Sequence, residues 1–281
     1  MDSTKGTRVT PMQRIKTMFH RLKQEGRPAL IPFITAFDPS LHTTRTLMDV
    51  LCGGGADMLE LGMPFSDPTA DGPIIERAHH RALSSPTTMA SLFQMIGQWR
   101  TQNTTTPLIL MGYANPVLAC GMESFFAQAA QHGVDGLILV DVPLEESPPF
   151  AALARTHHMA LIRLIAPNTE PERLERLLND ADGFVYHVAR TGVTGTQLHD
   201  KDALTTRLRW VKQRCSLPLV VGFGIKTGHD VAHIARYADG VVVGSALVDI
   251  IAQNVDDDGM MKKRIQDKMY ELSHALSAQT L

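Results

Sequence analysis

Short apolar segments alternate with longer amphipathic segments along most of this chain. The apolar segments are rich in Val, Ile and Leu, and they run without strict alternation of apolar and polar positions. Continuous apolar runs are typical of strands that are covered on both faces, as in a parallel sheet flanked by helices. Eight segments are therefore expected to be strands: residues 30–37, 58–61, 108–113, 136–140, 161–165, 184–188, 219–223 and 240–243.

The segments between these runs show the 3.6-residue period of helices. Helices are expected at residues 43–51, 89–100, 122–131, 148–157, 171–178, 203–214, 229–235 and 260–278. An additional amphipathic segment at residues 12–23 precedes the first expected strand. We expect this extra helix to cover one end of the strand bundle.

This alternation predicts an α/β fold, a single (β/α)8 TIM barrel with an additional N-terminal helix. The 281 residues contain no Ser/Gly/Pro-rich linker, so residues 1–281 are expected to form one domain. The main alternative is an open doubly wound sheet. Such a sheet usually has fewer strands and a GxGxxG motif after the first, whereas the first strand here leads into TAFDP.

Composition narrows the class of protein. The chain is 44% hydrophobic with a net charge of −2, so it can bury a full core, and neither a nucleic acid nor a membrane is an expected partner. Cys52, Cys120 and Cys215 are widely separated, which argues against a disulfide framework or a zinc site. The N-terminal segment has no apolar signal core. We expect a cytoplasmic protein.

The candidate chemistry lies in LELGMPFSDPTADGP, residues 59–73. Glu60 stands inside an apolar run, where burial would raise the carboxyl pKa and allow proton exchange near neutral pH. Asp71 follows in a loop rich in Pro and Gly. The alternatives are a buried Glu satisfied by neighbouring donors and an Asp chosen for turn formation.

The last two expected strands end in glycine, at Gly224 and Gly244, and Ser245 follows at the start of a helix. Glycine lets backbone N–H groups approach an anion closely, and a helix N-terminus favours negative charge. Barrels of this kind often bind phosphate at these two loops. We therefore expect a phosphate site, although such glycines also serve as ordinary turn residues.

The loop after the sixth expected strand carries ARTGVTG, residues 189–195. A cation, small hydroxyl residues and glycines are typical of a lid that closes over a substrate, and an ordinary loop is the alternative. Tyr186 lies near the end of the strand that leads into this loop, where its phenol can donate to a substrate or a carboxylate. A core tyrosine is the alternative for that residue.

The twelve histidines do not predict a metal site. His79 and His80 are adjacent and would diverge on a helix. His229 and His233 have the spacing of zinc ligands, but a third ligand and the glutamate of an HExxH motif are missing.

Several motifs occur in the order typical of one family. They are TAFDP at 35–39, LELGMPFSDPTADGP, LMGYANPV at 110–117, DVPLEES at 141–147, RTGVTG at 190–195, GFGI and GSA. Over nearly its whole length the chain resembles the alpha subunit of tryptophan synthase. The resemblance implies a lyase that cleaves indole-3-glycerol phosphate into indole and glyceraldehyde 3-phosphate by a retro-aldol reaction, without a cofactor or metal in this subunit. It also implies an α2β2 complex with a beta subunit, which would hold pyridoxal phosphate and receive the indole.

The resemblance also implies roles for individual residues. Glu60 matches the acid/base that protonates the indole ring carbon and helps to remove the glycerol hydroxyl proton. Asp71 matches the carboxylate that accepts the indole N–H and stabilises the cationic indolenine, and Tyr186 lies beside both. Thr194 matches a lid threonine that orients Asp71 on closure.

Further positions match binding residues of the family. The phosphate positions are Gly195, Gly224, Gly244 and Ser245; those lining the indole pocket are Tyr113 and Phe223; and those of a loop that contacts the partner are Asp67 and Pro68. Three positions depart from the family pattern, since Phe37 replaces a glycine, Glu76 a glutamine and Ala189 a serine. We expect Phe37 to alter the first loop and Glu76 to change the charge near the partner surface.

Two other functions remain open at this point. The chain could be a binding module that activates a beta subunit without turnover of its own. It could also be another sugar-phosphate isomerase or lyase, although the segment 64–73 argues against that.

Overall fold

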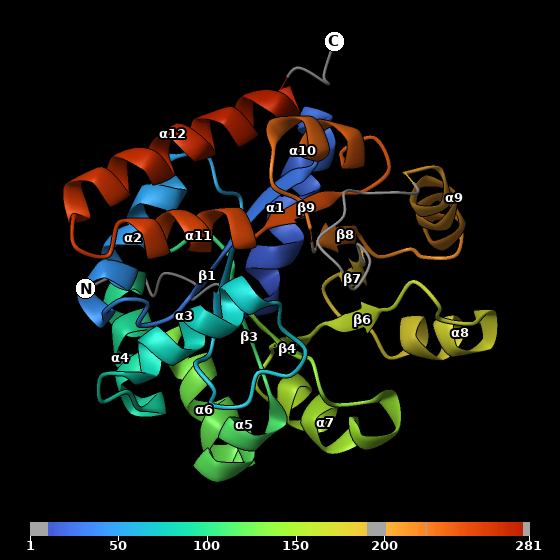
Figure 1. The fold of residues 1–281 in the computed structure, drawn as a ribbon. Coiled ribbons are helices and arrows are strands. Elements are labelled where there is room, and N and C mark those ends of the chain that lie inside the picture. The colour runs from blue at the N-terminus through green and yellow to red at the C-terminus, as the bar shows by residue number, and fades with distance from the viewer. Residues whose placement is uncertain (1–10, 190–200, 223, 278–281) are drawn as a thin grey trace, which may run out of the picture.

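A parallel β-sheet surrounded by helices forms the centre of the computed structural model, which describes residues 11–189, 201–222 and 224–277 (Figure 1). Its strands are β1 (Ala29–Thr35), β2 (Leu59–Gly62), β3 (Leu108–Gly112), β4 (Gly136–Leu139), β5 (Ala160–Leu161), β6 (Arg163–Ile165), β7 (Val185–Val188), β8 (Leu219–Gly222) and β9 (Gly240–Val243). The order in the sheet is β5-β4-β3-β2-β1-β9-β8-β7-β6, and every pair is parallel.

The sheet closes into a barrel at residues 160–165. Strand β5 pairs with β4 and strand β6 pairs with β7, while only Ile162 separates β5 from β6. The Ile162 N–H also donates to the carbonyl of Leu137 at 3.0 Å, which continues the bonding to β4. β5 and β6 are thus two halves of one barrel strand, so the predicted eight-stranded barrel is confirmed, with its fifth strand divided.

Helices cover the outside of the barrel (Figure 1). They are α1 (Pro11–Glu25), α2 (Leu41–Gly53), α3 (Pro73–Leu83), α4 (Met89–Arg100), α5 (Ala114–Cys120), α6 (Met122–His132), α7 (Pro148–Thr156), α8 (Pro171–Asn179), α9 (Lys201–Lys212), α10 (Gly228–Ile234), α11 (Ser245–Gln253) and α12 (Asp258–Ser277), with a 3-10 turn at Leu144–Glu146. Every predicted helix is present to within a few residues. Helices α3 and α5 and the length of α11 were not predicted.

Alternate strand residues divide the core into two clusters. Leu59 and Leu61 point outward and pack in the larger cluster between the strands and the helices. Residues of opposite parity, such as Phe33 and Tyr186, belong to a second cluster inside the barrel. Because side chains alternate along a strand, Glu60 and Gly62 face the barrel interior.

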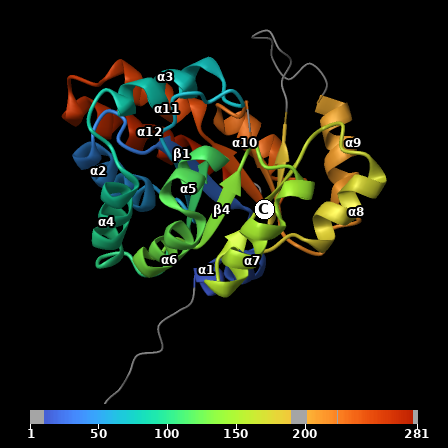
Figure 2. The same ribbon diagram turned by 90° about the horizontal axis from the view of Figure 1, so that it is seen from below.

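Helix α1 covers the N-terminal end of the barrel, as the sequence predicted. Its apolar face joins the interior cluster, and the ring of Phe19 lies 5.9 Å from that of Phe184. The N–H of Met12 donates to the carbonyl of His158 at 3.0 Å, which fixes the start of α1 beside α7 (Figure 2).

One device recurs at this end of the barrel. In three places an aspartate just before a strand accepts an N–H from the first or second residue of the neighbouring strand. The pairs are Asp57 with Leu30 at 3.0 Å, Asp135 with Leu108 at 2.8 Å and Asp239 with Leu219 at 2.7 Å. Each carboxylate satisfies a backbone donor that the sheet leaves open.

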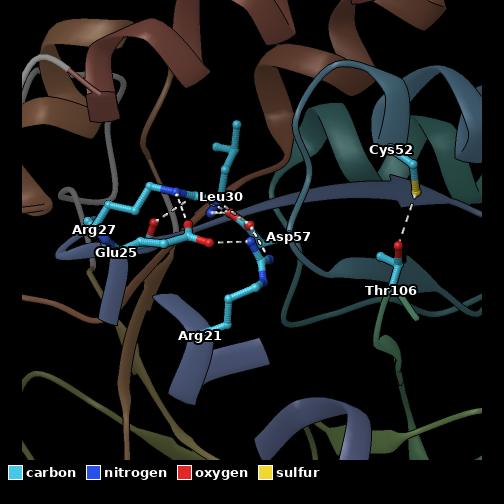
Figure 3. A network of polar contacts seen from close by, with 8 residues as sticks. Arg21, Glu25, Arg27, Leu30, Cys52, Asp57 and Thr106 are labelled. Atoms are coloured by element: carbon cyan, nitrogen blue, oxygen red, sulfur yellow. Dashed lines mark hydrogen bonds and ion pairs between the residues drawn. The ribbon is translucent and has the colours of Figure 1, made fainter. Parts of the chain in front are cut away.

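Asp57 also ties α1 and the start of β1 to the barrel (Figure 3). Its carboxylate accepts two bonds from Arg27, at 2.7 and 2.8 Å, and one from Arg21 at 3.2 Å. The Asp57 side chain is almost completely buried, so these charged groups interact with little screening by water.

We expect Asp57→Ala to lower the free energy of unfolding by about 2–4 kcal/mol, because it leaves the buried N–H of Leu30 without an acceptor and removes the buried carboxylate that pairs with Arg27. Urea denaturation followed by circular dichroism measures this loss. Asp256→Ala is the matched control: Asp256 is exposed before α12, and we expect a change within about 0.5 kcal/mol. Equal midpoints for the two variants would contradict the anchoring role of Asp57.

Cys52, Cys120 and Cys215 carry free thiols. Over the described ranges, no helix combines the length and the apolar character needed to span a bilayer.

Candidate active site

Glu60 lies on β2 with its side chain inside the barrel, and the residue is 1% exposed. Burial, with a smaller contribution from the negative charge of Asp71, raises the pKa of this carboxyl to about 8. Its Oε1 has no hydrogen-bond partner among the described residues. With this pKa, Glu60 is mostly protonated at neutral pH and can give up its proton close to that pH.

Asp71 lies in the loop between β2 and α3, near the C-terminal end of the barrel. The N–H of Asp71 donates to the carbonyl of Pro68 at 3.0 Å, which closes a turn. The Asp71 Oδ2 accepts the hydroxyl of Tyr113 at 2.8 Å, and Nε2 of His79 lies 3.3 Å from the same oxygen. The carboxylate is thus fixed by two buried side chains.

Tyr113 follows β3 directly and bridges the Asp71 loop. Its hydroxyl donates to Asp71 and accepts the N–H of Ala70 at 3.0 Å, and its ring lies 5.1 Å from that of Phe65. Burial and the negative charge of Asp71 raise the pKa of this phenol above its ordinary range. Tyr113, expected only to line a pocket, is also a hydrogen-bond donor to the second carboxylate.

Tyr186 lies on β7 inside the barrel and is 2% exposed. Burial, and after it the charges of Glu60 and Asp71, raise the pKa of its phenol well above the ordinary value, so the hydroxyl keeps its proton. Gly222, at the end of β8, makes room for it: a Cβ at residue 222 would lie 1.9 Å from the Tyr186 hydroxyl oxygen.

A small cavity adjoins these groups at the C-terminal end of the strands. It is lined by Phe33, Gly62, Asp71, His79, Met111, Gly112, Tyr113 and Val140. Sequence reasoning missed Phe33, His79, Met111 and Gly222. Phe33 pairs with Glu60 in the β1–β2 ladder, a register that only the folded sheet supplies.

The candidate phosphate residues that the structure describes lie at the same end of the barrel. Gly224 has a φ of 81°, in the left-handed region that favours glycine. Gly244 is the N-cap of α11 and Ser245 is its first residue, and no described side chain caps this helix N-terminus. A Cβ on Gly244 would lie 3.1 Å from the ring of Phe33, so the helix end adjoins the cavity wall. Thr194, Gly195 and Phe223 lie outside the described residues.

The two candidate partner residues differ in exposure. Asp67 is exposed, whereas Pro68 is buried, although both lie in the loop that leads to Asp71. Of the pair, the Asp67 side chain is the one that an approaching protein can reach.

The three departures from the family pattern have clear local settings. Phe37 is buried and has a φ of 64°, a conformation that glycine adopts without strain, so the replacement is accommodated at some cost in the first loop. Glu76 is half-exposed in the first turn of α3, with its carboxylate 4.0 Å from Nε2 of His80. Ala189 is buried, and its N–H donates to the carbonyl of Gly222 at 2.9 Å.

A search of the described ranges for three or more His, Cys, Asp or Glu side chains that could jointly hold a metal ion finds no such group.

Comparisons with known proteins point to one family. The family described as "Tryptophan synthase alpha chain" matches residues 19–277. A protein named tryptophan synthase alpha chain from Acidiphilium cryptum is 46% identical over 267 residues, which covers 95% of this chain and 97% of the relative.

Solved structures agree. The alpha subunit of tryptophan synthase from Legionella pneumophila superposes with a TM-score of 0.87 at 37% identity, covering 94% of this chain and 98% of that one. A chain of the tryptophan synthase α2β2 complex from Pyrococcus furiosus gives a TM-score of 0.80 at 37% identity, covering 88% and 99%.

Proposed function

The chain belongs to the tryptophan synthase alpha chain family, whose alpha subunit cleaves indole-3-glycerol phosphate to indole for the beta subunit, and we propose that Glu60 and Asp71 perform this lyase reaction here. The observation that carries the assignment is the pairing of a buried carboxyl whose pKa is about 8 with a second carboxylate nearby. When the surroundings of two carboxyl groups give them different pKa values, one group can exchange protons while the other stays ionised.

In the first step, protonated Glu60 donates its proton to the ring carbon that bears the glycerol phosphate chain. The ring becomes a cationic indolenine whose charge is centred on the ring nitrogen. Asp71 accepts the hydrogen bond of the ring N–H and stabilises this charge. A carboxylate fixed beforehand by Tyr113 needs little reorganisation when the charge develops.

In the second step, the Glu60 carboxylate accepts the proton of the hydroxyl on the chain carbon next to the ring. That carbon becomes the aldehyde carbon, the carbon–carbon bond breaks, and its electron pair restores the indole ring. Glu60 ends the cycle protonated, as it began. Tyr186 lies close enough to both carboxyls for their negative charges to raise the pKa of its phenol, and we assign its neutral hydroxyl to the orientation of the substrate.

We assign the phosphate of the substrate to the backbone N–H groups around Gly224, Gly244 and Ser245, together with Gly195, and the indole ring to a pocket that includes Tyr113 and Phe223. The uncapped N-terminus of α11 supports the phosphate assignment. Thr194 would orient Asp71 when the lid closes. The reaction as written needs no cofactor or metal in this subunit.

We further propose that a beta subunit, which would hold pyridoxal phosphate, binds at the loop of Asp67 and Pro68 in an α2β2 complex. The exposure of Asp67 supports this contact. Residues 1–281 would act as one domain in the cytoplasm, the compartment that the separated free cysteines favour.

The test is indole release from indole-3-glycerol phosphate, measured with and without a cognate beta subunit. We expect release by the wild type to rise when the beta subunit is added. Asp71→Asn should lower kcat by about a hundredfold or more, because the charge that stabilises the cation is lost. Asp256→Asn, a change of an exposed carboxylate far along the sequence, is expected to leave kcat unchanged.

Two outcomes would overturn the assignment. No release by the wild type in the presence of a bound and active beta subunit would favour a binding module without turnover. Release that persists in Asp71→Asn would remove Asp71 from the chemistry and reopen the choice of another sugar-phosphate lyase.

A further inference from the structure

We infer that His79 is a positioning residue for Asp71, a role that rests on the proposed function of the site. His79 lies on α3, which begins two residues after Asp71, and its ring lines the cavity beside Glu60's strand. Nothing in the sequence separates His79 from its neighbour His80. In the fold, however, the His79 side chain is 3% exposed and that of His80 is 61% exposed.

The contacts of the His79 ring define its tautomer. Its Nδ1 accepts the backbone N–H of Phe65 at 3.2 Å, so Nδ1 carries no proton. The ring proton must then be on Nε2, because one nitrogen of a neutral imidazole is a donor and the other an acceptor. Nε2 lies 3.3 Å from Oδ2 of Asp71. A neutral ring therefore directs its N–H toward the carboxylate.

This arrangement holds Asp71 by one oxygen. The Tyr113 hydroxyl and the His79 ring both meet Oδ2, at 2.8 and 3.3 Å, and Oδ1 takes part in neither contact. The side chains of His79 and Asp71 are 3% and 4% exposed, so water screens their interaction weakly. We therefore assign the ring N–H of the substrate to Oδ1, the oxygen that neither of these two side chains contacts.

The ring also joins two parts of one loop. Phe65 and Asp71 both belong to the segment between β2 and α3, and His79 contacts the backbone of the first and the carboxylate of the second. A displacement of the segment at Phe65 would therefore move the ring that holds Asp71.

Two substitutions separate these contacts. In His79→Asn, the amide oxygen occupies the place of Nδ1 and still accepts the Phe65 N–H, but nothing reaches Asp71. In His79→Gln, the amide N–H occupies the place of Nε2 and still faces Asp71, but the acceptor for Phe65 is lost. His80→Gln is the matched control on the exposed side of the helix.

We expect His79→Asn to lower kcat for indole release about tenfold with little change in KM, because the lost contact acts mainly as charge develops in the transition state. His79→Gln should keep kcat within about threefold of the wild type while its melting temperature falls, since the partly buried N–H of Phe65 loses its acceptor. His80→Gln should alter neither quantity.

Equal kcat in His79→Asn and the wild type would overturn the inference, as would a tenfold loss of kcat in a folded His79→Gln. If His79→Asn does not fold, a loss of kcat in a folded His79→Gln can still overturn the inference, and the ring tautomer of the wild type supplies the supporting result. Nitrogen NMR of histidine-labelled wild-type protein gives a test independent of activity. A His79 ring protonated on Nδ1 would refute the positioning role even if the proposed function itself failed in the assay.

Discussion

Replacing Glu60 by Gln is expected to lower kcat for indole release by about a thousandfold, even in the presence of a saturating beta subunit. Glutamine has nearly the shape of a protonated glutamate, so it fits the same buried position without a new charge. It has no proton to donate to the ring carbon and cannot accept one from the hydroxyl. The measurement is single-turnover indole release together with equilibrium binding of the substrate.

Substrate binding should change little in this variant, because the proposed contacts to the glycerol phosphate and the ring come from other groups. Glu123→Gln, a change at an exposed residue in the first turn of α6, is the control and should match the wild type in both measurements. A Glu60→Gln protein that binds the substrate and retains more than a tenth of the wild-type kcat would show that another group moves the proton.

The pH dependence of the wild type follows from the same carboxyl. In the proposed reaction Glu60 is protonated at the start of the cycle, and burial raises its pKa in the folded protein to about 8. We therefore expect kcat/KM to be maintained up to neutral pH and to fall as the pH rises through about 8. A rise in activity over that interval would mean that the ionised form begins the reaction.

Stability should depend on pH in the same direction. The folded protein holds the Glu60 proton up to a pH of about 8, whereas the unfolded chain releases it near the ordinary pKa of 4.5. Between these values the unfolded state binds fewer protons, so the free energy of unfolding falls as the pH rises. Glu60→Gln removes this loss and should be more stable than the wild type at pH 8. The protein thus keeps, at the proposed catalytic position, a carboxyl that reduces its stability as the pH rises toward 8.

The barrel could be predicted from the sequence because most of its strands are continuous apolar runs between segments of helical period. Helix α3 was missed because its buried face consists of Ala78, His79 and Ala82, which give no apolar stripe of large side chains. For helix α11, the sequence predicted only the start, at Ser245. The helix is apolar on most sides and directly follows β9, so the sequence shows no polar face opposite an apolar one. The fifth strand is divided because β5 pairs with β4 and β6 pairs with β7. The local sequence of residues 160–165 does not predict these pairings.

Residues of the candidate site could be proposed from the sequence where a residue type is unusual in its setting. A carboxylate in an apolar run indicated Glu60, and glycines at strand ends indicated Gly224 and Gly244. His79 and Gly222 were missed because only the fold shows what they contact. Helix α3 brings His79 to Asp71, and the pairing of β7 with β8 brings Gly222 to Tyr186. In the sequence alone, a pair of histidines or a glycine in a strand is compatible with many structural roles. Only the residues around it in the fold show which role applies.

Gly222→Ala is expected to lower kcat by about ten- to a hundredfold, through Tyr186 rather than through any contact of its own with substrate. A Cβ at residue 222 would lie 1.9 Å from the Tyr186 hydroxyl oxygen and 2.5 Å from Cζ, distances that force the ring to move. Tyr186 is packed inside the barrel, so its displacement should also lower the free energy of unfolding by about 1–3 kcal/mol. Kinetic assays and urea denaturation measure the two effects.

The control is Gly53→Ala, since a Cβ at residue 53 would meet nothing within 4 Å. The role of Tyr186 is isolated by adding Tyr186→Phe to each protein. If Gly222→Ala acts by displacing the hydroxyl, it should cost much less in kcat once that hydroxyl is absent, so the two changes will be strongly non-additive. Additive losses would instead mean that the Ala methyl group disturbs the barrel at β8 itself and does not act through the Tyr186 hydroxyl.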